Sequence, residues 1–307
     1  MLYYTARRVL QAIPVVLGVS VIVFALMNVL PGDAVTAMNA EFGMTPEAMA
    51  RMRTELGLDQ PIYIRVARSL WQLLQGDLGS SIYNNRGVVE QILEQLPATI
   101  QLAVASMVIG VVLGIVFGTL AAVRQNSWID TTSMVISLVG VSMPVFWLGL
   151  LLIMLFSVSL SWLPATGTGG PETLIMPALA LSFRLVGTTA RLVRSSMLEV
   201  LHAEYVTTAR AKGLMERVVL TRHALRNALI PVVTMVGIQF GVMLGGAVVI
   251  ETVFGRQGIG SMAVQAIIAR DYPLVQGVVL LTAVSYVVVN LLVDISYGFI
   301  DPRIRYD

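Results

Sequence analysis

The sequence predicts an all-α integral membrane protein with six transmembrane helices. Three observations carry this prediction. Of the 307 residues, 56% are hydrophobic and only 12% are charged, and the mean hydropathy is +0.81. A soluble chain of this length needs more charged side chains to cover its surface. The apolar residues gather in six long runs, and five of the 20 basic residues gather in one helix-prone block, 204–231.

Each of the six apolar runs is long enough to cross a bilayer, because a hydrocarbon core of roughly 30 Å takes about 20 residues of helix. The runs cover residues 9–30, 100–123, 132–160, 174–193, 229–254 and 274–300. The first run is too long for a secretory signal and lacks a cleavage motif after Leu30, so we interpret it as a signal anchor. Pro14, Pro144, Pro177 and Pro231 lie in or at the ends of these spans. Each frees a backbone carbonyl that neighbouring helices must satisfy.

Two spans carry glycine at a spacing that places small residues on one helix face. The glycines are Gly110, Gly114 and Gly118 in the second span and Gly237, Gly241 and Gly245 in the fifth. Such a face lets two helix backbones approach closely. The pattern fits fixed packing between helices, and it also fits a gate or a subunit interface that shifts.

The distribution of lysine and arginine predicts that both termini lie in the cytoplasm. With this orientation, twelve of the 20 basic residues lie inside and seven outside, and Arg184 lies within the fourth span. Short cytoplasmic loops carry the excess of positive charge in membrane proteins. The outer basic residues lie mostly in one long segment, where that rule is weak.

We divide the chain into three parts: a tail and first transmembrane helix over 1–30, an external cap over 31–97, and a five-helix core over 98–307 that includes a cytoplasmic loop, 198–228. In the cap we expect helices over 45–53, 62–74 and 88–95. Thr45 is the expected N-cap of the first, with Pro46 at its first helical position. The second is amphipathic and carries Tyr63 and Trp71. We expect the cap to rest on the outer membrane face and the outer segments 161–172 and 252–273 to be loops.

The chain lacks the residues that a catalytic or metal site would need. It contains no cysteine, and its two histidines, His202 and His223, both lie in the basic block. A metal site would need further ligands beside them. A phosphate-binding P-loop requires Gly-Lys followed by Ser or Thr, whereas the only lysine, Lys212, is followed by Gly213. The chain therefore cannot hydrolyse ATP by that route.

Ionisable residues are scarce within the predicted spans. Asp130, Glu251 and Asp294 each lie near the end of a span, whereas Arg184 lies near the middle of one. A carrier driven by protons or sodium usually holds ionisable groups at mid-membrane. The sequence thus favours a membrane path that receives its energy from another subunit.

A series of short motifs runs nearly from end to end of the chain. They are 30–33 (LPGD), 56–61 (LGLDQP), 76–79 (GDLG), 142–146 (SMPVF), 194–197 (RSSM), 209–214 (ARAKGL), 223–228 (HALRNA), 270–273 (RDYP) and 290–294 (NLLVD). In this order and at these spacings, they resemble the first permease subunit of ABC importers of the dipeptide, oligopeptide and nickel group. Two positions depart from the pattern. Thr207 stands where the general permease signature begins with glutamate, and Gln257 stands where the group often has proline.

The resemblance implies a fold similar to type I ABC importer permeases, in the cytoplasmic membrane of a bacterium or archaeon. The implied partners are a second homologous permease subunit, two cytoplasmic ATPase subunits and an extracytoplasmic solute-binding protein. ATP and magnesium would be bound by the ATPase subunits, so this chain would hold no cofactor and would not itself be an enzyme. No nucleic-acid partner is implied.

The resemblance also implies that a coupling helix near 204–212 receives the movement of the ATPase. The implied contact residues are Glu204, Tyr205, Thr208, Ala209, Arg210, Ala211, Lys212, Gly213 and Leu214. Small alanines would let the helix enter a groove, and Arg210 and Lys212 could pair with acids at its rim. Gly213 would permit the turn back toward the membrane. The alternative for the basic residues is simple anchoring to anionic lipid headgroups.

Residues for the translocation path are less sharply indicated. Arg184, Met143 and Phe146 are our candidates. Arg184 is chosen because a lone cation in a span is costly unless it faces a cavity or a partner, and Met143 and Phe146 belong to the motif 142–146. Arg184 could attract the terminal carboxylate of a peptide, or it could pair with an acid or reach water. We expect Asn290 and Asp294 to form hydrogen bonds between helices. Short peptides are the implied cargo, with glutathione and nickel chelates as alternatives; an ion-coupled carrier and a structural scaffold are the alternatives from other classes.

Overall fold

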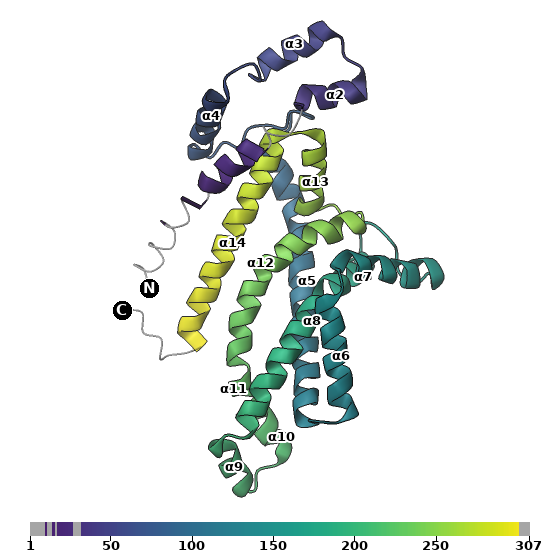
Figure 1. Cartoon of the computed structure of the whole chain (residues 1–307), viewed down its shortest axis with the longest axis vertical. Coiled ribbons are helices and arrows are strands. Elements are labelled where there is room, and N and C mark those ends of the chain that lie inside the picture. Colours follow the sequence, from purple (N-terminus) through teal and green to yellow (C-terminus); the bar gives the residue numbers. More distant parts are fainter. Residues whose placement is uncertain (1–9, 11–13, 16, 27–31, 301–307) are drawn as a thin grey trace. The chain divides into compact units, whose positions relative to one another are not determined.

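The computed structural model describes residues 10, 14, 15, 17–26 and 32–300, without the side chains of 41, 42, 290 and 292–300. Figure 1 shows that these residues form helices joined by turns and loops. Within this part of the chain there is no β-strand, and only an isolated bridge joins Ser80 to Gly87. The prediction of an all-α protein is confirmed.

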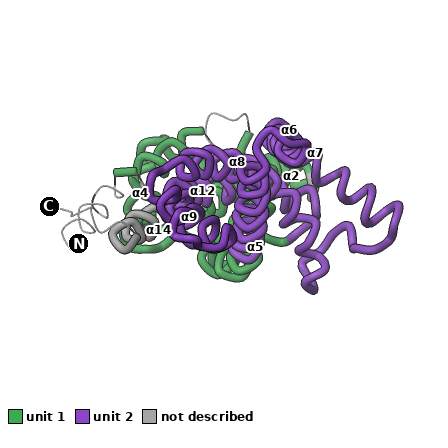
Figure 2. The backbone as a smooth tube through the Cα atoms, turned by 90° about the horizontal axis from the view of Figure 1, so that it is seen from below, with its two compact units in different colours: residues 1–98, 257–291, 306 green, residues 99–256, 292–305, 307 purple. Residues whose placement is uncertain are grey.

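The chain forms two compact units, which Figure 2 distinguishes by colour. Unit 1 comprises Met1–Ala98 and Gln257–Leu291, and unit 2 comprises Thr99–Arg256 and Leu292–Arg305, with one further terminal residue in each. The units are described separately below.

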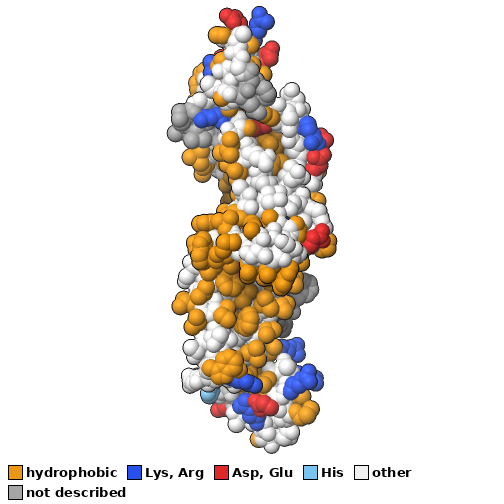
Figure 3. Space-filling view, turned by 90° about the vertical axis from the view of Figure 1, so that its right-hand side faces the viewer, with side chains coloured by type: hydrophobic (Ala, Val, Ile, Leu, Met, Phe, Trp, Pro, Cys, Tyr) orange, Lys and Arg blue, Asp and Glu red, His pale blue; other side chains and the backbone are white. Residues whose placement is uncertain are grey.

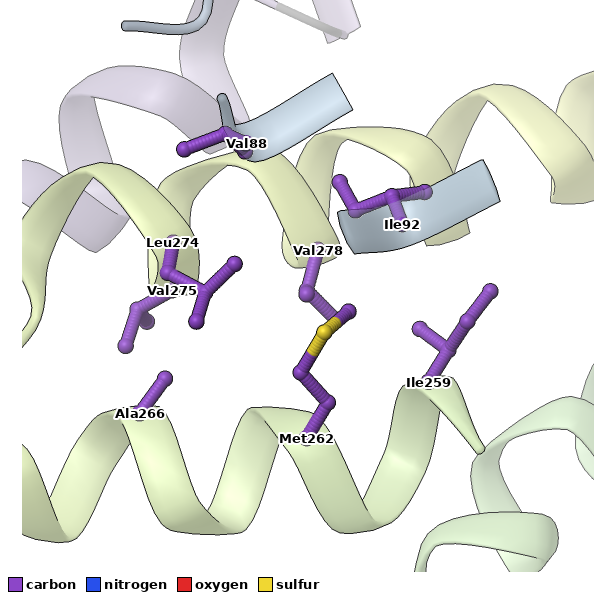
Figure 4. Close-up of a cluster of buried hydrophobic side chains, with 8 residues drawn as sticks. All are labelled: Val88, Ile92, Ile259, Met262, Ala266, Leu274, Val275 and Val278. Carbon is purple, nitrogen blue, oxygen red and sulfur yellow. The ribbon is translucent and has the colours of Figure 1, made fainter. Parts of the chain in front are cut away.

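Unit 1 holds the predicted cap together with the last long helix. Its elements are the apolar helix Leu17–Leu26, α2 (Ala34–Phe42), α3 (Pro46–Glu55), α4 (Ile62–Leu74), the first turns of α5 (Val88–Val123), α13 (Ile259–Ala269) and the described start of α14 (Tyr272–Ile300). Its core is a cluster that α5, α13 and α14 share. Figure 4 shows Met262 of α13 reaching toward Val278 of α14, with Val88 and Ile92 of α5 beside them.

Helix ends in the cap follow from their capping residues. The carboxylate of Asp33 accepts a hydrogen bond from the Thr36 amide at 2.8 Å and starts α2, which ends at Gly43 in the left-handed conformation. Thr45 caps α3, and Pro46 occupies its first turn, which confirms that prediction. The predicted helix over 62–74 is also confirmed, because α4 spans the same residues.

Two expectations for the outer segments are wrong. The helix expected over 88–95 does not end there, because α5 continues through Pro97 as one 36-residue helix. A proline inside a helix removes one backbone hydrogen bond, and α5 continues through Pro97 without that bond. The segment 252–273 is not only a loop, since it contains α13.

Unit 2 is built around α8 (Glu172–Leu201), which packs against its neighbours on several sides. The other elements are the remainder of α5, α6 (Trp128–Ser142), α7 (Val145–Leu152), the π-helix η1 (Ile153–Ser159), α9 (Glu204–Ala211), α10 (Glu216–Val218), the π-helix η2 (Val219–Leu225), α11 (Arg226–Ala228) and α12 (Ile230–Val253). One hydrophobic cluster joins α7, α8 and α12, and a second joins α8, η2, α11 and α12. A larger share of α8 is buried than of the other candidate spans.

The single span predicted over 132–160 is instead broken into two. Helices α6 and α7 meet at an angle of 108°. The break falls at Met143, whose backbone is extended (φ −78°, ψ 128°) directly before Pro144. A residue before proline is pushed out of the helical region by its clash with the proline ring, so the sequence Met-Pro ends α6 and lets α7 start in a new direction.

Four described helices are long and apolar enough to cross a membrane: α5, α8, α12 and Tyr272–Val289 of α14. Counting the bent α6–α7 pair as one span gives up to five. The apolar helix Leu17–Leu26 is shorter, and the rest of the first predicted run lies outside the described residues. Six spans therefore stay a prediction. The candidates Asn290 and Asp294 lie outside the residues whose side chains are described.

The glycine face of α5 is a packing surface within this chain. A Cβ atom at Gly110 would lie 2.6 Å from Leu185, one at Gly114 would lie 2.4 Å from Thr189, and one at Gly118 would lie 2.5 Å from the Ala190 carbonyl oxygen. Helix α8 therefore approaches α5 as closely as only glycine permits. By contrast, a Cβ at Gly245 of α12 would meet no atom within 4 Å.

Candidate functional site

The basic block folds as a short helical excursion between α8 and α12. Helix α9 follows Ala203, which is extended, and carries Glu204 in its first turn and Arg210 in its last. Both charges oppose the partial charges of the helix ends. The helix stops at Gly213, which has φ +76° and donates its amide hydrogen to the Arg210 carbonyl at 2.9 Å. A Cβ at Gly213 would meet no atom within 4 Å, so the position requires glycine for its backbone conformation and not for space.

One face of α9 is fixed to the chain's own core. Val206 is fully buried and Ala209 is 6% exposed, and both pack against Val219 of η2. Ala209 therefore faces inward, whereas Ala211 is exposed. Of the two alanines that were expected to enter a groove on a partner, only Ala211 lies on the free side of the helix.

An ion pair ties the end of α9 to α10. Arg210 donates from Nη2 to Glu216 Oε1 at 2.8 Å and from Nε to Oε2 at 3.2 Å. These hydrogen bonds hold the pKa of the Glu216 carboxyl below its usual range and raise the pKa of Arg210. The pair is solvent-exposed and contributes little to stability, but it links the two sides of the Gly213 turn. The sequence suggested an acid on a partner for Arg210, and the structure supplies one from the same loop.

The free side of this loop combines charge with exposed apolar surface. The exposed residues include Glu204, Tyr205, Thr208, Ala211, Lys212, Leu214 and Met215, and Met215 is 72% exposed. The Tyr205 hydroxyl accepts a hydrogen bond from Asn227 at 2.8 Å, which holds the ring beside the second half of the loop. Figure 3 shows basic, acidic and histidine side chains gathered at the lower end, below a broad hydrophobic surface.

Three residues that shape this loop were missed from the sequence: Met215, Glu216 and Asn227. Each lies within the basic block, but none belongs to the motif 209–214 around Gly213, and only Asn227 falls in another motif, 223–228. A glutamate three residues after the turn glycine was the available signal for the ion pair with Arg210.

Among the path candidates, Arg184 lies in the middle of α8 and is exposed. It forms no ion pair and no side-chain hydrogen bond with another described residue, and it lines a small cavity of about 70 Å³ with Val145, Gln239 and Met243 among the other residues. Met143 ends α6 at the bend and Phe146 is 47% exposed on α7. Neither lines the Arg184 cavity, so the structure does not bring the three candidates into one site.

Two of the acids near the span ends, Asp130 and Glu251, have partners within the chain. Asp130 accepts two hydrogen bonds from Arg194, at 2.6 Å and 2.8 Å, which join α6 to α8. Glu251 is fully buried at the end of α12 and accepts a hydrogen bond from Thr99 at 2.5 Å. Nearby, burial lowers the pKa of Arg256, an effect that the charge of Glu251 opposes. These residues therefore serve packing between helices. Among the described residues, no group of three His, Asp or Glu side chains could hold a metal ion.

Several helices apolar enough to cross a membrane, and a basic helical loop with one exposed side, define a membrane protein with a surface suited to a partner. The chain belongs to the family described as the inner membrane component of binding-protein-dependent transport systems. The model of this family matches residues 114–306, and the model of the N-terminal part of such components matches residues 1–103.

Relatives match over the whole length. A peptide transport system permease protein of Brucella abortus is 45% identical over 98% of both chains. A dipeptide transport system permease protein of Alkalihalophilus pseudofirmus is 40% identical and a glutathione transport system permease protein of Salmonella paratyphi A is 42% identical, each over 100% of both chains.

Solved structures of ABC transporters share the fold. An inward-facing methionine transporter has a TM-score of 0.56 at 19% identity, covering 69% of this chain and 97% of the other. An amino acid transporter with histidines has a TM-score of 0.52 at 17% identity, covering 70% and 95%. The chain is thus the permease component of an ABC importer in the inner membrane, and it is a transport subunit without its own ATPase site.

Proposed function

We propose that this chain is one of two homologous permease subunits that together enclose a path for short peptides. In this proposal an extracytoplasmic binding protein delivers the peptide, and two cytoplasmic ATPase subunits supply ATP hydrolysis with magnesium. The chain crosses the membrane six times with both termini inside. The names of full-length relatives support a peptide cargo.

The geometry of α9 is the observation that carries the coupling role. Its inner face is fixed by Val206 and Ala209 against Val219, so a force on its outer face is passed directly to η2 and on to the helices of unit 2. The turn that follows α9 carries the exposed side chains of Leu214 and Met215. An exposed surface that mixes apolar and basic side chains is suited to a protein partner.

ATP binding would close the two ATPase subunits and displace α9. Because α8 leads into α9 and α12 follows η2 and α11, such a displacement would rock α8 and α12 between inward-facing and outward-facing states. Gly213 would keep the turn after α9 compact, and the Arg210–Glu216 pair would hold its two sides together.

Arg184 is our candidate contact for the peptide on the path. It is exposed on a helix that a bilayer would surround, and it has no ion partner among the described side chains. A positive charge at this depth is stabilised when an anionic group passes or a water-filled cavity adjoins it. Replacement of Arg184 by methionine should slow uptake of peptides that carry a free terminal carboxylate more than uptake of amidated ones. Equal uptake of both kinds by this variant would remove the assignment.

Transport by the assembled complex in proteoliposomes tests the proposed function. Uptake of a labelled dipeptide should require the binding protein and ATP and should stop with vanadate, whereas a protonophore should leave it unchanged. Uptake that continues in vanadate and stops with the protonophore would instead identify an ion-coupled carrier.

Competition between cargoes separates the substrate alternatives. The 42% identity to a glutathione permease makes glutathione the second candidate. A series of unlabelled dipeptides should compete for uptake, while glutathione and nickel chelates should not. Stronger competition by glutathione would transfer the assignment to that cargo and leave the coupling mechanism intact.

A further inference from the structure

Helix α4 turns its polar face toward the chain and its apolar face outward. A helix packed on a soluble protein does the reverse. None of its 13 residues is buried. One face carries an apolar stripe at helical spacing, which we call the α4 stripe: Tyr63, Ala67, Leu70, Trp71 and Leu74. Three of these side chains are highly exposed: Tyr63 at 70%, Trp71 at 64% and Leu74 at 68%.

The opposite face of α4 turns toward the chain itself and is polar. Arg65, Arg68, Ser69 and Gln72 line a cavity of about 490 Å³, together with the first turns of α14 and the loop before α5. The guanidinium of Arg65 lies 5.6 Å from the ring of Phe24 and 5.9 Å from the ring of Tyr272. The polar face therefore has partners within the chain, whereas every residue of the α4 stripe except the partly buried Leu70 is exposed.

The position of α4 relative to the membrane follows from one contact. The Ser69 hydroxyl donates a hydrogen bond to Gln276 Oε1 at 2.9 Å. Gln276 lies in the first turns of the candidate span Tyr272–Val289. Helix α4 (labelled in Figure 1) is thereby held beside the first turns of α14, which is the level where α14 would enter a bilayer if Tyr272–Val289 spans it.

The composition of the stripe identifies what covers it. Tryptophan and tyrosine concentrate at the boundary between headgroups and acyl chains, where the ring is apolar and its polar tip reaches water. A helix with an apolar face of this kind and basic residues on the polar face lies in the plane of that boundary. We propose that α4 lies flat in the bilayer surface at the Tyr272 end of α14, with the α4 stripe against the lipid acyl chains and the polar cavity on its other side.

Single cysteines can test this proposal directly, because the chain contains no cysteine of its own. Nitroxide labels are placed at Ala67, Trp71 or Leu74 on the stripe, and at Arg68 or Gln72 on the polar face as matched controls. The complete transporter is studied in phospholipid nanodiscs. Collision of each label is measured with oxygen, which concentrates in lipid, and with a water-soluble nickel chelate.

The proposal predicts that the ratio of oxygen to nickel collision is at least several-fold higher at the three stripe positions than at the two controls. The Ala67 and Leu74 variants leave both aromatic residues in place, so a loss of folding at Trp71 does not decide the outcome. Free access of the nickel chelate to the stripe would overturn the proposal in favour of water. Exclusion of both probes from the stripe would overturn it in favour of a protein neighbour, such as the second permease subunit.

Discussion

Gly213 is required for the proposed coupling because of its backbone conformation and not because of the space around it. Its φ of +76° lies in the left-handed region, and the space around it is open. A residue with a side chain costs about 1–2 kcal/mol in this conformation, and a β-branched one is the least suited. We predict that Gly213→Val lowers peptide uptake by roughly tenfold or more, while membrane insertion is unchanged.

The control for that variant is built into the chain. Gly43 ends α2 with φ +64°, and a Cβ atom at this position would also meet no atom within 4 Å. Gly43→Val introduces the same kind of strain far from α9 in the sequence, and uptake should stay close to that of the unchanged protein. Full uptake by the Gly213 variant, or equal losses in both, would contradict the coupling role of this turn.

The pair of Asp130 and Arg194 gives a prediction about stability. The side chain of Asp130 is only 7% exposed, and an acid left without its partner in such surroundings costs roughly 3–5 kcal/mol. We predict that Arg194→Met lowers the thermal unfolding temperature in detergent strongly. Adding Asp130→Asn should recover part of the loss, because a neutral amide keeps an acceptor for the Asn126 amide without the buried charge. A double variant no more stable than Arg194→Met would show that the pair is not what stabilises this contact.

At the level of residues, the sequence predicted where the candidate loop lies. It did not predict how the side chains of that loop are oriented. The turn at Gly213 follows from the residue type, and the structure has the glycine in the expected conformation. The inward direction of Ala209 could not be predicted, because alanine is compatible with either face of a helix. The partner of Arg210 depends on how the chain folds back after the turn, which no local pattern specifies.

The close contact between α5 and α8 is the clearest prediction at the level of elements. A Cβ at Gly114 would lie 2.4 Å from Thr189 and 3.2 Å from the Val186 carbonyl oxygen, so Gly114→Ala must push the two helices apart. Overpacking of this kind costs about 1–3 kcal/mol. We predict a fall of several degrees in the thermal unfolding temperature, measured in detergent.

Gly245→Ala is the matched control, because that position on α12 has open space for the same methyl group. Its unfolding temperature should match that of the unchanged protein. An equal fall for the two variants would mean that glycine matters here for helix flexibility and not for the approach of α8.

Some helix boundaries could be predicted from sequence patterns and others could not. Cap residues such as Thr45 and the run over 62–74 gave correct helices, because local hydrogen bonds and local periodicity decide them. Pro97 and Pro144 look alike in sequence, yet α5 continues through the first and the chain bends by 108° at the second. The residue type at the proline therefore does not by itself specify whether a helix continues or breaks there.

At the scale of the whole molecule, composition was sufficient to predict a multi-spanning helical protein, and the family match and the relatives agree with the class that the motifs indicated. The number of spans is less directly readable. The α6–α7 run is apolar throughout but is bent, and α13 is apolar but only 11 residues long. Hydropathy reports burial in an apolar medium and not the direction of a helix within it.

The division of the chain into an outer cap and a membrane core remains our prediction, as does the placement of both termini in the cytoplasm. The division follows from the water-facing segment 31–97 between apolar runs and the orientation from the distribution of arginine and lysine. Together they would place α9 on the ATPase side of the membrane and α4 on the outer side. The two surfaces can therefore be tested independently, one against a protein partner and one against lipid.

The measurement that tests the coupling role most directly is cross-linking from two alanines of α9. Cysteine is introduced at Ala211, which is exposed, or at Ala209, which is buried against Val219, in the assembled transporter with a photoreactive thiol reagent. We predict that the cysteine at 211 joins the chain to an ATPase subunit and that the cysteine at 209 does not. Absence of any ATPase cross-link from 211, under conditions in which the complex transports its substrate, would contradict the coupling role.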